Sequence, residues 1–470
     1  MAGSAEGPPS SGPASADIKP GSAEPIGLTD SATREILHAL DRRQDTRVEA
    51  LVNKLHVADQ ADLLEMVGPE NRRVLVDVLR PVFNPEVLPE LDETVRDEVI
   101  DILSTAELAT AVSELESDDA VHVVEDLSED DKQALLEAIP ETDREVVEEG
   151  LSYPERSAGR LMQRELVAVP ASWHIGQIID HLRSAADLPD EFYDIIVIDA
   201  NHRPIGSVAL SKAIRSQRAV IVQDIMNSEL KPVPAEMDQE EVGYLFHQYD
   251  LVSAPVVDGN GRLVGVITVD DVVDVIEEEA EEDIMRLGGV SETDLHESLV
   301  TTTRRRFVWL LVNLGTAIIA SVVIGLFDAT IEQMVALAVL MPIVASMGGN
   351  AGTQTLTVAV RAIATKDLTA TNAMRVVNKE VLTGGVNGVL FAVLAGTVAY
   401  VWFGSLLLGL VIGAAMIFNM LVAALAGISI PLLLARVGID PAIAAGVFLT
   451  TVTDVIGFFA FLGLAALVFL

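Results

Sequence analysis

Polar and small residues interrupt a long apolar segment at Leu340–Thr357, whose sequence is LMPIVASMGGNAGTQTLT. The polar residues of the stretch include Ser346, Asn350, Thr353, Gln354 and Thr357. Their spacing of three and four residues places them on one face of a helix. A polar face inside hydrocarbon is costly unless it meets a partner helix or water. A helix–helix contact is the simpler explanation, but so many polar side chains favour a pore, and Gly348 and Gly349 would let a hydrated ligand come close.

Asp454 lies near the middle of the last apolar segment, with Thr450 and Thr451 one turn before it on its face of the helix. An ionisable group at mid-membrane costs about 2.5–3.5 kcal/mol on the insertion scale and marks a functional site by default. Neither residues 307–360 nor residues 437–470 contain a lysine or arginine that could pair with it. The carboxylate therefore faces water, stays protonated or meets a mobile cation, and we favour the cation.

The negative charge of the chain is concentrated in its first two thirds. The 470 residues carry a formal net charge of −39 and include no cysteine, which excludes disulfides and thiolate metal sites. Residues 307–470 hold five basic and six acidic residues, which leaves a net −38 on residues 1–306. Such a field repels phosphates, so it argues against nucleic acid as a partner and favours divalent cations.

The chain begins with two segments of different character. Residues 1–28 are rich in Gly, Pro, Ser and Ala without an apolar core, which predicts a disordered cytoplasmic tail and not a signal peptide. Residues 29–151 carry short apolar runs at helical spacing, often preceded by Asp or Ser as an N-cap. The recurring pattern predicts helical hairpins stacked in a small superhelix.

Residues 152–283 contain an internal repeat. The segment IIVIDANHRPIGSVAL at 195–210 matches APVVDGNGRLVGVITV at 254–269, so that Asp199 pairs with Asp258, 59 residues further on. Each copy predicts a helix, a strand, a turn, a second strand and a helix. This arrangement resembles a tandem pair of CBS domains, which is an α/β module.

Pairs of CBS domains often bind adenine nucleotides through a short signature that contacts ribose and phosphate. The second copy keeps this signature as Gly265, Thr268 and Asp271. The first copy departs from it, with Ala209 and Lys212 at the Thr and Asp positions. The resemblance therefore leaves ATP open as a ligand, and a folding and dimerisation module is the alternative.

Carboxylates crowd the helix predicted for residues 270–284, DDVVDVIEEEAEEDI. Asp271, Asp274 and Glu278 share one helical face, where like charges repel and weaken the helix. A bound divalent cation would reverse that penalty, because hard cations prefer several carboxylates or their shared waters. A solvated acidic face is the simpler interpretation.

Five apolar segments follow, at 307–327, 334–364, 381–403, 406–435 and 441–470, each long enough to span a bilayer. The basic residues near these spans lie before the first, between the second and third, and between the fourth and fifth. The loops near 328–333 and 404–405 have none. The pattern predicts a multi-pass protein of the plasma (inner) membrane, with its amino terminus in the cytoplasm and its carboxyl terminus outside.

The runs PIVASMGGNAGTQTLTVAVRAIATKDL and GIDPAIAAGVFLTTVTDV resemble the membrane domain of MgtE-type magnesium transporters. The order of the soluble domains is similar as well. The resemblance implies a multidomain fold: a regulatory all-α superhelical N domain, a tandem CBS (α/β) pair, a connecting or plug helix, and a five-helix transmembrane domain. These parts correspond to residues 29–151, 152–283, 284–306 and 307–470, after the tail at 1–28.

The resemblance also implies roles for individual residues. The second and fifth spans would line the pore, with Asp454 anchoring the ion and the path formed by Ser346, Gly348, Gly349, Asn350, Gln354, Thr450 and Thr451. Cytosolic Mg²⁺ would be sensed by the acids that match the family pattern, namely Asp238, Glu240, Asp271, Asp274, Glu279, Glu282 and Asp283. Gly446 departs from some relatives, which carry Asn there. The resemblance therefore does not assign the residues that form the inner mouth of the pore.

These features together predict a homodimeric Mg²⁺ channel that mediates influx and is closed by Mg²⁺ bound to its acidic cytosolic domains. A two-fold axis would bring two copies of Asp454 together and match a divalent charge. The alternatives are a transporter of Mn²⁺ or Co²⁺, a nucleotide-binding receptor that the membrane part only anchors, and an intramembrane hydrolase. Softer metals are disfavoured because no His, Cys or Met lies near Asp454. The hydrolase lacks a second catalytic group, since no His follows His296.

Overall fold

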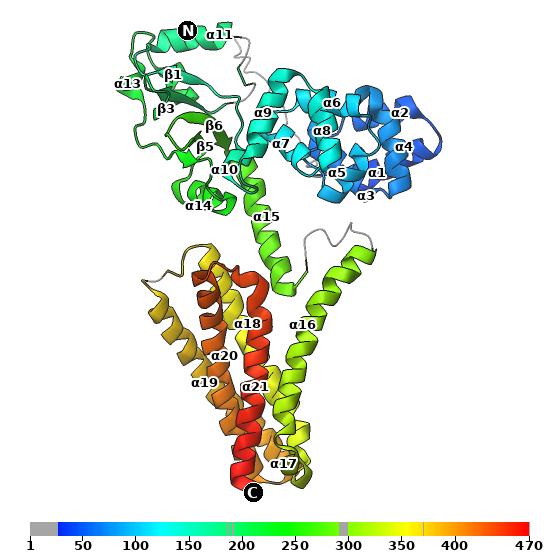
Figure 1. Ribbon diagram of the computed structural model, residues 1–470, viewed down its shortest axis with the longest axis vertical. Coiled ribbons are helices and arrows are strands. Elements are labelled where there is room, and N and C mark those ends of the chain that lie inside the picture. Colours follow the sequence, from blue (N-terminus) through cyan, green and yellow to red (C-terminus); the bar gives the residue numbers. More distant parts are fainter. Residues whose placement is uncertain (1–26, 186–187, 190–191, 291–298, 370, 470) are drawn as a thin grey trace, which may run out of the picture. The chain divides into compact units, whose positions relative to one another are not determined.

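The computed structural model describes residues 27–469, apart from 186–187, 190–191, 291–298 and 370 (Figure 1). The chain forms two compact units, Met1–Glu149 and Gly150–Leu470. Nearly all of the tail predicted for residues 1–28 lies outside the described residues.

The first unit is built from short α-helices joined by tight turns, as the apolar periodicity predicts. The helices are α1 (Asp30–Asp41), α2 (Asp45–Val52), α3 (Val57–Met66), α4 (Pro69–Leu79), α5 (Glu93–Ile100), α6 (Thr105–Glu114), α7 (Ser117–Glu125), α8 (Glu129–Ala138) and α9 (Glu141–Ser152). Side chains cap several of them: Ser104 and Glu107 form a reciprocal capping box on α6, and Ser128 caps α8. The all-α prediction for this domain is confirmed.

Two buried arginines tie successive helices of the first unit together. Arg72 of α4 donates to the carbonyl oxygen of Leu64 at 2.8 Å and forms an ion pair with Glu98 of α5. Arg96 of α5 forms an ion pair with Asp126, just after α7. A buried charge is tolerated only when paired, so Arg72 fixes α4 against α5, and Arg96 fixes α5 against the end of α7.

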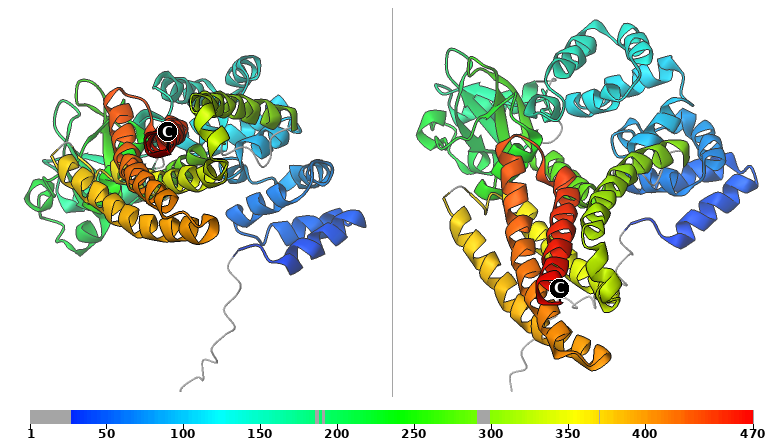
Figure 2. Two further views of the ribbon diagram at one scale, coloured as in Figure 1. Left: turned by 90° about the horizontal axis from the view of Figure 1, so that it is seen from below. Right: turned by 60° about the horizontal axis from the view of Figure 1, so that its bottom comes forward.

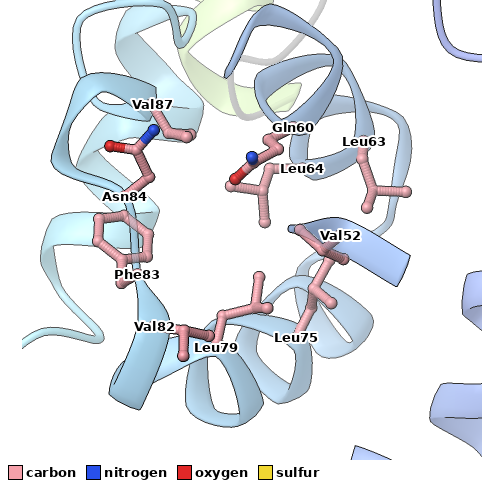
Figure 3. Close-up of a pocket in the computed structure, with 10 residues that line it drawn as sticks. All are labelled: Val52, Gln60, Leu63, Leu64, Leu75, Leu79, Val82, Phe83, Asn84 and Val87. Carbon is pink, nitrogen blue, oxygen red and sulfur yellow. The ribbon is translucent and has the colours of Figure 1, made fainter. Parts of the chain in front are cut away.

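The interior of the first unit is closely packed. Its small enclosed space has a volume of about 10 Å³ and is lined mainly by apolar side chains, with Gln60 and Asn84 as the polar ones (Figure 3). A space of that size is near the minimum for one water molecule. It therefore offers no room for a metabolite.

The repeat in residues 152–283 folds as two equivalent three-stranded sheets. One contains β1 (Ala168–Pro170), β2 (Asp194–Ile198) and β3 (Pro204–Ala209), and the other β4 (Val233–Pro234), β5 (Ser253–Val257) and β6 (Leu263–Thr268). In each sheet the first pair of strands is parallel and the second antiparallel. Helices α10 (Ala158–Leu161), α11 (Ile175–Ser184), α12 (Leu210–Arg215), α13 (Val222–Ile225) and α14 (Gln239–Tyr249) complete the copies. The predicted tandem pair is confirmed.

Gly265 is a position where this pair depends on the absence of a side chain. A Cβ there would lie 2.7 Å from Met162 Sδ and 2.9 Å from the carbonyl oxygen of Gln163. We therefore expect Gly265→Ala to destabilise the protein by about 1–3 kcal/mol, the usual cost of overpacking. Thermal unfolding measures this loss. Gly259→Ala is the matched control, because a Cβ there meets nothing within 4 Å, and equal melting temperatures for the two variants would contradict the packing.

The acidic helix α15 (Val269–Gly288) leaves the second repeat and ends where Gly289 adopts a φ of +71°. Only a residue without Cβ adopts this backbone conformation readily, so the helix stops there. Of the residues 284–306, predicted to form the connecting helix, 284–288 belong to the end of α15 and 299–306 to the start of α16 (Leu299–Gly325). The residues between them, 291–298, lie outside the described part of the chain.

Five helices in the described part of the chain are long and apolar enough to cross a membrane, as predicted. They are α16, α18 (Ala336–Ala364), α19 (Ala373–Phe403), α20 (Leu406–Arg436) and α21 (Pro441–Phe469), with the short α17 (Asp328–Gln333) after the first. In both views α20 lies between α19 and α21 (Figures 1 and 2). Helices α19 and α20 approach closely at Gly396 and Gly409, where a Cβ on either glycine would lie 2.6–2.8 Å from the other's carbonyl oxygen.

Candidate functional site

The polar residues of α18 share one exposed face of a continuous helix. The exposed polar residues are Ser346, Asn350, Thr353, Gln354 and Thr357. The opposite face, which includes Leu340, Val344, Gly348 and Gly352, is buried. The predicted stripe is therefore the surface of α18 that its own chain leaves uncovered.

Asp454 lies at the same level of the bundle as this stripe. Gly352 of α18 lies against Leu449 of α21, while Gly348 and Gly457 both lie against Asn419 of α20. The two helices therefore run antiparallel, and the segment between Leu449 and Gly457 lies alongside residues 348–352. Asp454 belongs to this segment of α21, and Asn350 belongs to the facing segment of α18.

The Asp454 carboxylate is half-buried, and among the described residues it forms no ion pair or hydrogen bond. The neighbouring hydroxyls bond to their own helix: Thr450 Oγ1 donates to Gly446 O at 2.9 Å, and Thr451 Oγ1 to Val447 O at 2.7 Å. Because each hydroxyl hydrogen is used in this way, the oxygen is left as an acceptor. An anionic group beside acceptor oxygens suits a cation.

The two adjacent glycines of α18 have different surroundings. A Cβ at Gly348 would lie 2.2 Å from Asn419 Nδ2, whereas a Cβ at Gly349 would meet nothing within 4 Å. Gly348 therefore packs against α20, and Gly349 borders open space on the side of Asn350.

Carboxylates from different elements gather near the end of α15. Burial, together with Glu279, Asp283 and Asp238, raises the pKa of Glu240 to about 7. Burial, with Asp440 and Glu279, raises the pKa of Asp283 to about 6. These shifts show that Glu240, Glu279 and Asp283 form a cluster, the α14–α15 acid cluster, whose members repel one another.

Three of the predicted sensing residues stand apart from this cluster. Glu282 is buried between Arg156 and Arg286 and forms ion pairs with both. Asp271 accepts a hydrogen bond of 2.7 Å from Thr268 Oγ1 in the capping box of α15. Asp274 is exposed on the same helix. In the residues that the structure describes, no three carboxylates or imidazoles are placed to hold one metal ion directly.

The nucleotide signature of the second CBS copy has structural roles in this fold. Gly265 leaves room for the side chain of Met162, and Thr268 and Asp271 cap α15. The more open hollow, of about 450 Å³, is lined by Phe192, Tyr193, Asp194, Ala209, Leu210, Ser211 and Ile214 of the first copy and by Val252 of the second. The signature residues are therefore not among those that line the hollow.

Sequence reasoning missed two polar contacts of the membrane domain. Thr355 Oγ1 donates to Glu380 Oε2 at 3.5 Å, which joins α18 to the start of α19. Arg286 at the end of α15 pairs with Asp440, just before α21, at 2.6 Å. The lone Glu before the third apolar segment was a visible signal for the first contact. The second joins residues 154 positions apart, which no local pattern reveals.

Comparison with known proteins bears on the N domain, the CBS pair and the membrane domain. The family model described as "Divalent cation transporter" matches residues 341–464, the "MgtE intracellular N domain" model matches 55–156, and the CBS domain model matches 222–278. The chain is also similar to a solved structure of the cytosolic domain of the Mg²⁺ channel MgtE in complex with ATP. That similarity has 30% identity and a TM-score of 0.48, and covers 52% of this chain and 99% of that one.

Curated relatives cover both the soluble and the membrane parts. The magnesium transporter MgtE of Thermus thermophilus is 37% identical over 318 residues, covering 67% of this chain and 70% of that protein. The MgtE of Enterococcus faecalis is 34% identical over the same shares of the two chains. The MgtE of Bacillus subtilis is 29% identical over 88% of this chain and 92% of its own. These relatives are transporters and not enzymes, so the hydrolase alternative is wrong, and the chain belongs to the MgtE family of magnesium transporters.

Proposed function

We propose that two copies of this chain form a Mg²⁺-selective channel whose path runs between the polar face of α18 and Asp454 of α21. The observation that carries the proposal is the exposed polar stripe, because a single chain leaves it uncovered at the level of a half-buried carboxylate. A second copy across a two-fold axis would cover the stripe and bring two carboxylates to one ion. A polar helix face cannot stay exposed to lipid, and this requirement supports both the homodimer and the path.

The ligands of the proposed path favour Mg²⁺ over softer divalent ions. Carboxylate, amide and hydroxyl oxygens are hard ligands, and Mg²⁺ often keeps several of its waters when bound. Oxygen acceptors such as those of Asn350, Thr450 and Asp454 suit an ion that keeps its hydration shell. Mn²⁺ shares part of this ligand preference and is the alternative cargo, with Co²⁺ less suited.

We infer that the protein lies in the plasma membrane with its N domain and CBS pair in the cytoplasm, and that Mg²⁺ moves inward. The support is the placement of Arg361, Lys366 and Arg436 in or beside the loops after α18 and α20. These loops contact the CBS pair and α15, because Lys366 pairs with Glu241 of α14 at 3.4 Å and Asp440 pairs with Arg286 at 2.6 Å. Positively charged loops remain on the cytoplasmic side. An inside-negative potential would then drive the cation inward.

We also propose that internal Mg²⁺ closes the channel by binding at the α14–α15 acid cluster. Burial, and then repulsion by neighbouring carboxylates, raise the pKa of Glu240 and of Asp283, and a bound divalent ion would offset this repulsion. Carboxylates too far apart for direct ligation can still share one hydrated Mg²⁺. The Arg286–Asp440 ion pair supplies a contact by which α15 could act on α21.

We infer an adenine nucleotide such as ATP as a further ligand of the CBS pair. The support is the Gly265, Thr268 and Asp271 signature together with an open hollow formed mainly by the first copy. The hollow has room for a small ligand, and its Tyr193 and Ile214 are exposed apolar surface suited to an adenine ring.

Cysteine scanning tests the proposed path, because the chain has no native cysteine. We expect a charged, water-soluble thiol reagent to modify Asn350→Cys and Ser346→Cys in membranes and to block uptake. The buried Val344→Cys, on the same helix, and the exposed Leu394→Cys, on α19, are the controls that should stay unmodified. Unmodified cysteines at 346 and 350 would mean that the stripe faces protein or lipid and not water.

A further inference from the structure

Asn419 of α20 is fully buried within the membrane domain, with a relative exposure of 0%. Its Nδ2 donates a hydrogen bond of 2.8 Å to the carbonyl oxygen of Val344 on α18. No donor among the described residues reaches its Oδ1. The amide is therefore only half satisfied in a place that water does not reach.

Two glycines on different helices make room for this amide. A Cβ at Gly348 of α18 would lie 2.2 Å from Asn419 Nδ2, and a Cβ at Gly457 of α21 would lie 2.9 Å from Nδ2 and 3.0 Å from Oδ1. Any larger residue at either position would collide with the amide. Asn419 thus occupies a notch, defined by Gly348 and Gly457, between the two helices of the proposed path.

Packing alone does not explain an asparagine at this point. A buried acceptor without a partner is unfavourable, and an apolar side chain of similar volume would fill the notch without that cost. What the amide adds is a directed hydrogen bond to the backbone of α18, one turn before Gly348. Gly457 lies about one turn beyond Asp454 on α21. The amide therefore contacts both helices next to the groups proposed to meet the ion.

We propose that Asn419 is a positioning residue for ion conduction: seated in the Gly348–Gly457 notch, it fixes α18 against α21 and so sets the distance between the polar stripe and Asp454. This inference rests on the proposed ion path. It adds a part of the machinery that touches no ion and acts through the two helices that do.

The test is a suppressor experiment on the full-length protein. Gly348→Ala should lower the initial rate of Mg²⁺ uptake at least about tenfold, because small misplacements of reacting groups have effects of this size. Gly348→Ala with Asn419→Ala removes the collision and should recover most of that loss. Gly463→Ala on α21 is the control that should behave like wild type, since a Cβ there is 3.8 Å from Phe327 Cζ, an ordinary contact. Normal uptake by Gly348→Ala, or a double variant no better than the single one, overturns the proposal.

Asn419→Leu tests the hydrogen bond separately, because leucine has the same branched shape and the same number of side-chain heavy atoms but no hydrogen-bonding group. We expect it to reach the membrane and melt as wild type does, but with a KM for Mg²⁺ raised at least about threefold or a comparable loss of discrimination against Ca²⁺. A purely structural residue would leave KM and selectivity unchanged, and that result overturns the proposal even if Gly348→Ala fails to fold. Asp454→Ala is measured alongside: if it conducts normally, the ion path is wrong whatever the suppressor shows.

Discussion

Replacing Asp454 by alanine is expected to reduce Mg²⁺ uptake about 100-fold or more while leaving expression and folding intact. At about 4 Å and an effective dielectric near 20, one carboxylate attracts a unit charge by about 4 kcal/mol, and a divalent ion by more. Removing it raises the barrier for a cation at mid-membrane, and each 1.4 kcal/mol or so is a tenfold change in rate. Uptake into Mg²⁺-starved cells that produce the variant measures this.

Two companion variants separate charge from shape in that experiment. Asp454→Asn keeps the shape of the side chain and loses the charge, so it should be impaired nearly as strongly. Asp328→Asn also removes an acid, but from the exposed start of α17, and should transport normally. Wild-type uptake by Asp454→Ala would end the role assigned to this carboxylate.

Neutralising the α14–α15 acid cluster is expected to leave the channel running at internal Mg²⁺ concentrations that stop the wild type. The variant combines Glu240→Gln, Glu279→Gln and Asp283→Asn, which keep the side-chain shapes and remove the charges that would hold the ion. Inhibition should require at least about tenfold more internal Mg²⁺, the effect of losing roughly 1.4 kcal/mol of binding. The matched control is Glu277→Gln with Glu281→Gln, exposed acids of the same helix.

The acidity of the cluster gives a second readout. The pKa of Glu240 is about 7 and that of Asp283 about 6, so protons compete with Mg²⁺ below those values. Because both acids bind protons more tightly in the native state than in the unfolded chain, the cluster lowers stability as pH rises through about 4 to 7. The wild type should therefore be inhibited by less Mg²⁺ at pH 8 than at pH 6, and the neutralised variant should lose this dependence. Equal inhibition of the variant and the wild type at both pH values would contradict the proposed sensor.

Most of the fold could be predicted from the regular spacing of residues in the sequence. The 59-residue offset between Asp199 and Asp258 predicted two equivalent sheets, because the same strand and turn pattern forms wherever it recurs. The three- and four-residue spacing from Ser346 to Thr357 likewise predicted one face of one helix. Both are local properties, so neighbouring residues suffice to specify them.

Contacts between distant residues were beyond the sequence. Glu282 and Asp271 looked like equivalent members of an acidic run, yet Glu282 pairs with Arg156, 126 positions away, and Asp271 caps its own helix. Gly348 and Gly349 are adjacent and chemically identical, yet only Gly348 receives Asn419. Spacing shows which residues share a face, but the partner of that face depends on packing that no local pattern encodes.

Purified protein in liposomes that enclose a fluorescent Mg²⁺ indicator gives the most direct measurement. With Mg²⁺ outside, an inside-negative potential and a nearly Mg²⁺-free interior, the wild type should fill the vesicles rapidly, and preloading them with Mg²⁺ should slow that uptake for protein whose cytosolic face is inside. Asp454→Ala vesicles should fill no faster than protein-free ones. If the wild type admits no Mg²⁺, or if Asp454→Ala vesicles fill at the wild-type rate, conduction past this carboxylate is contradicted.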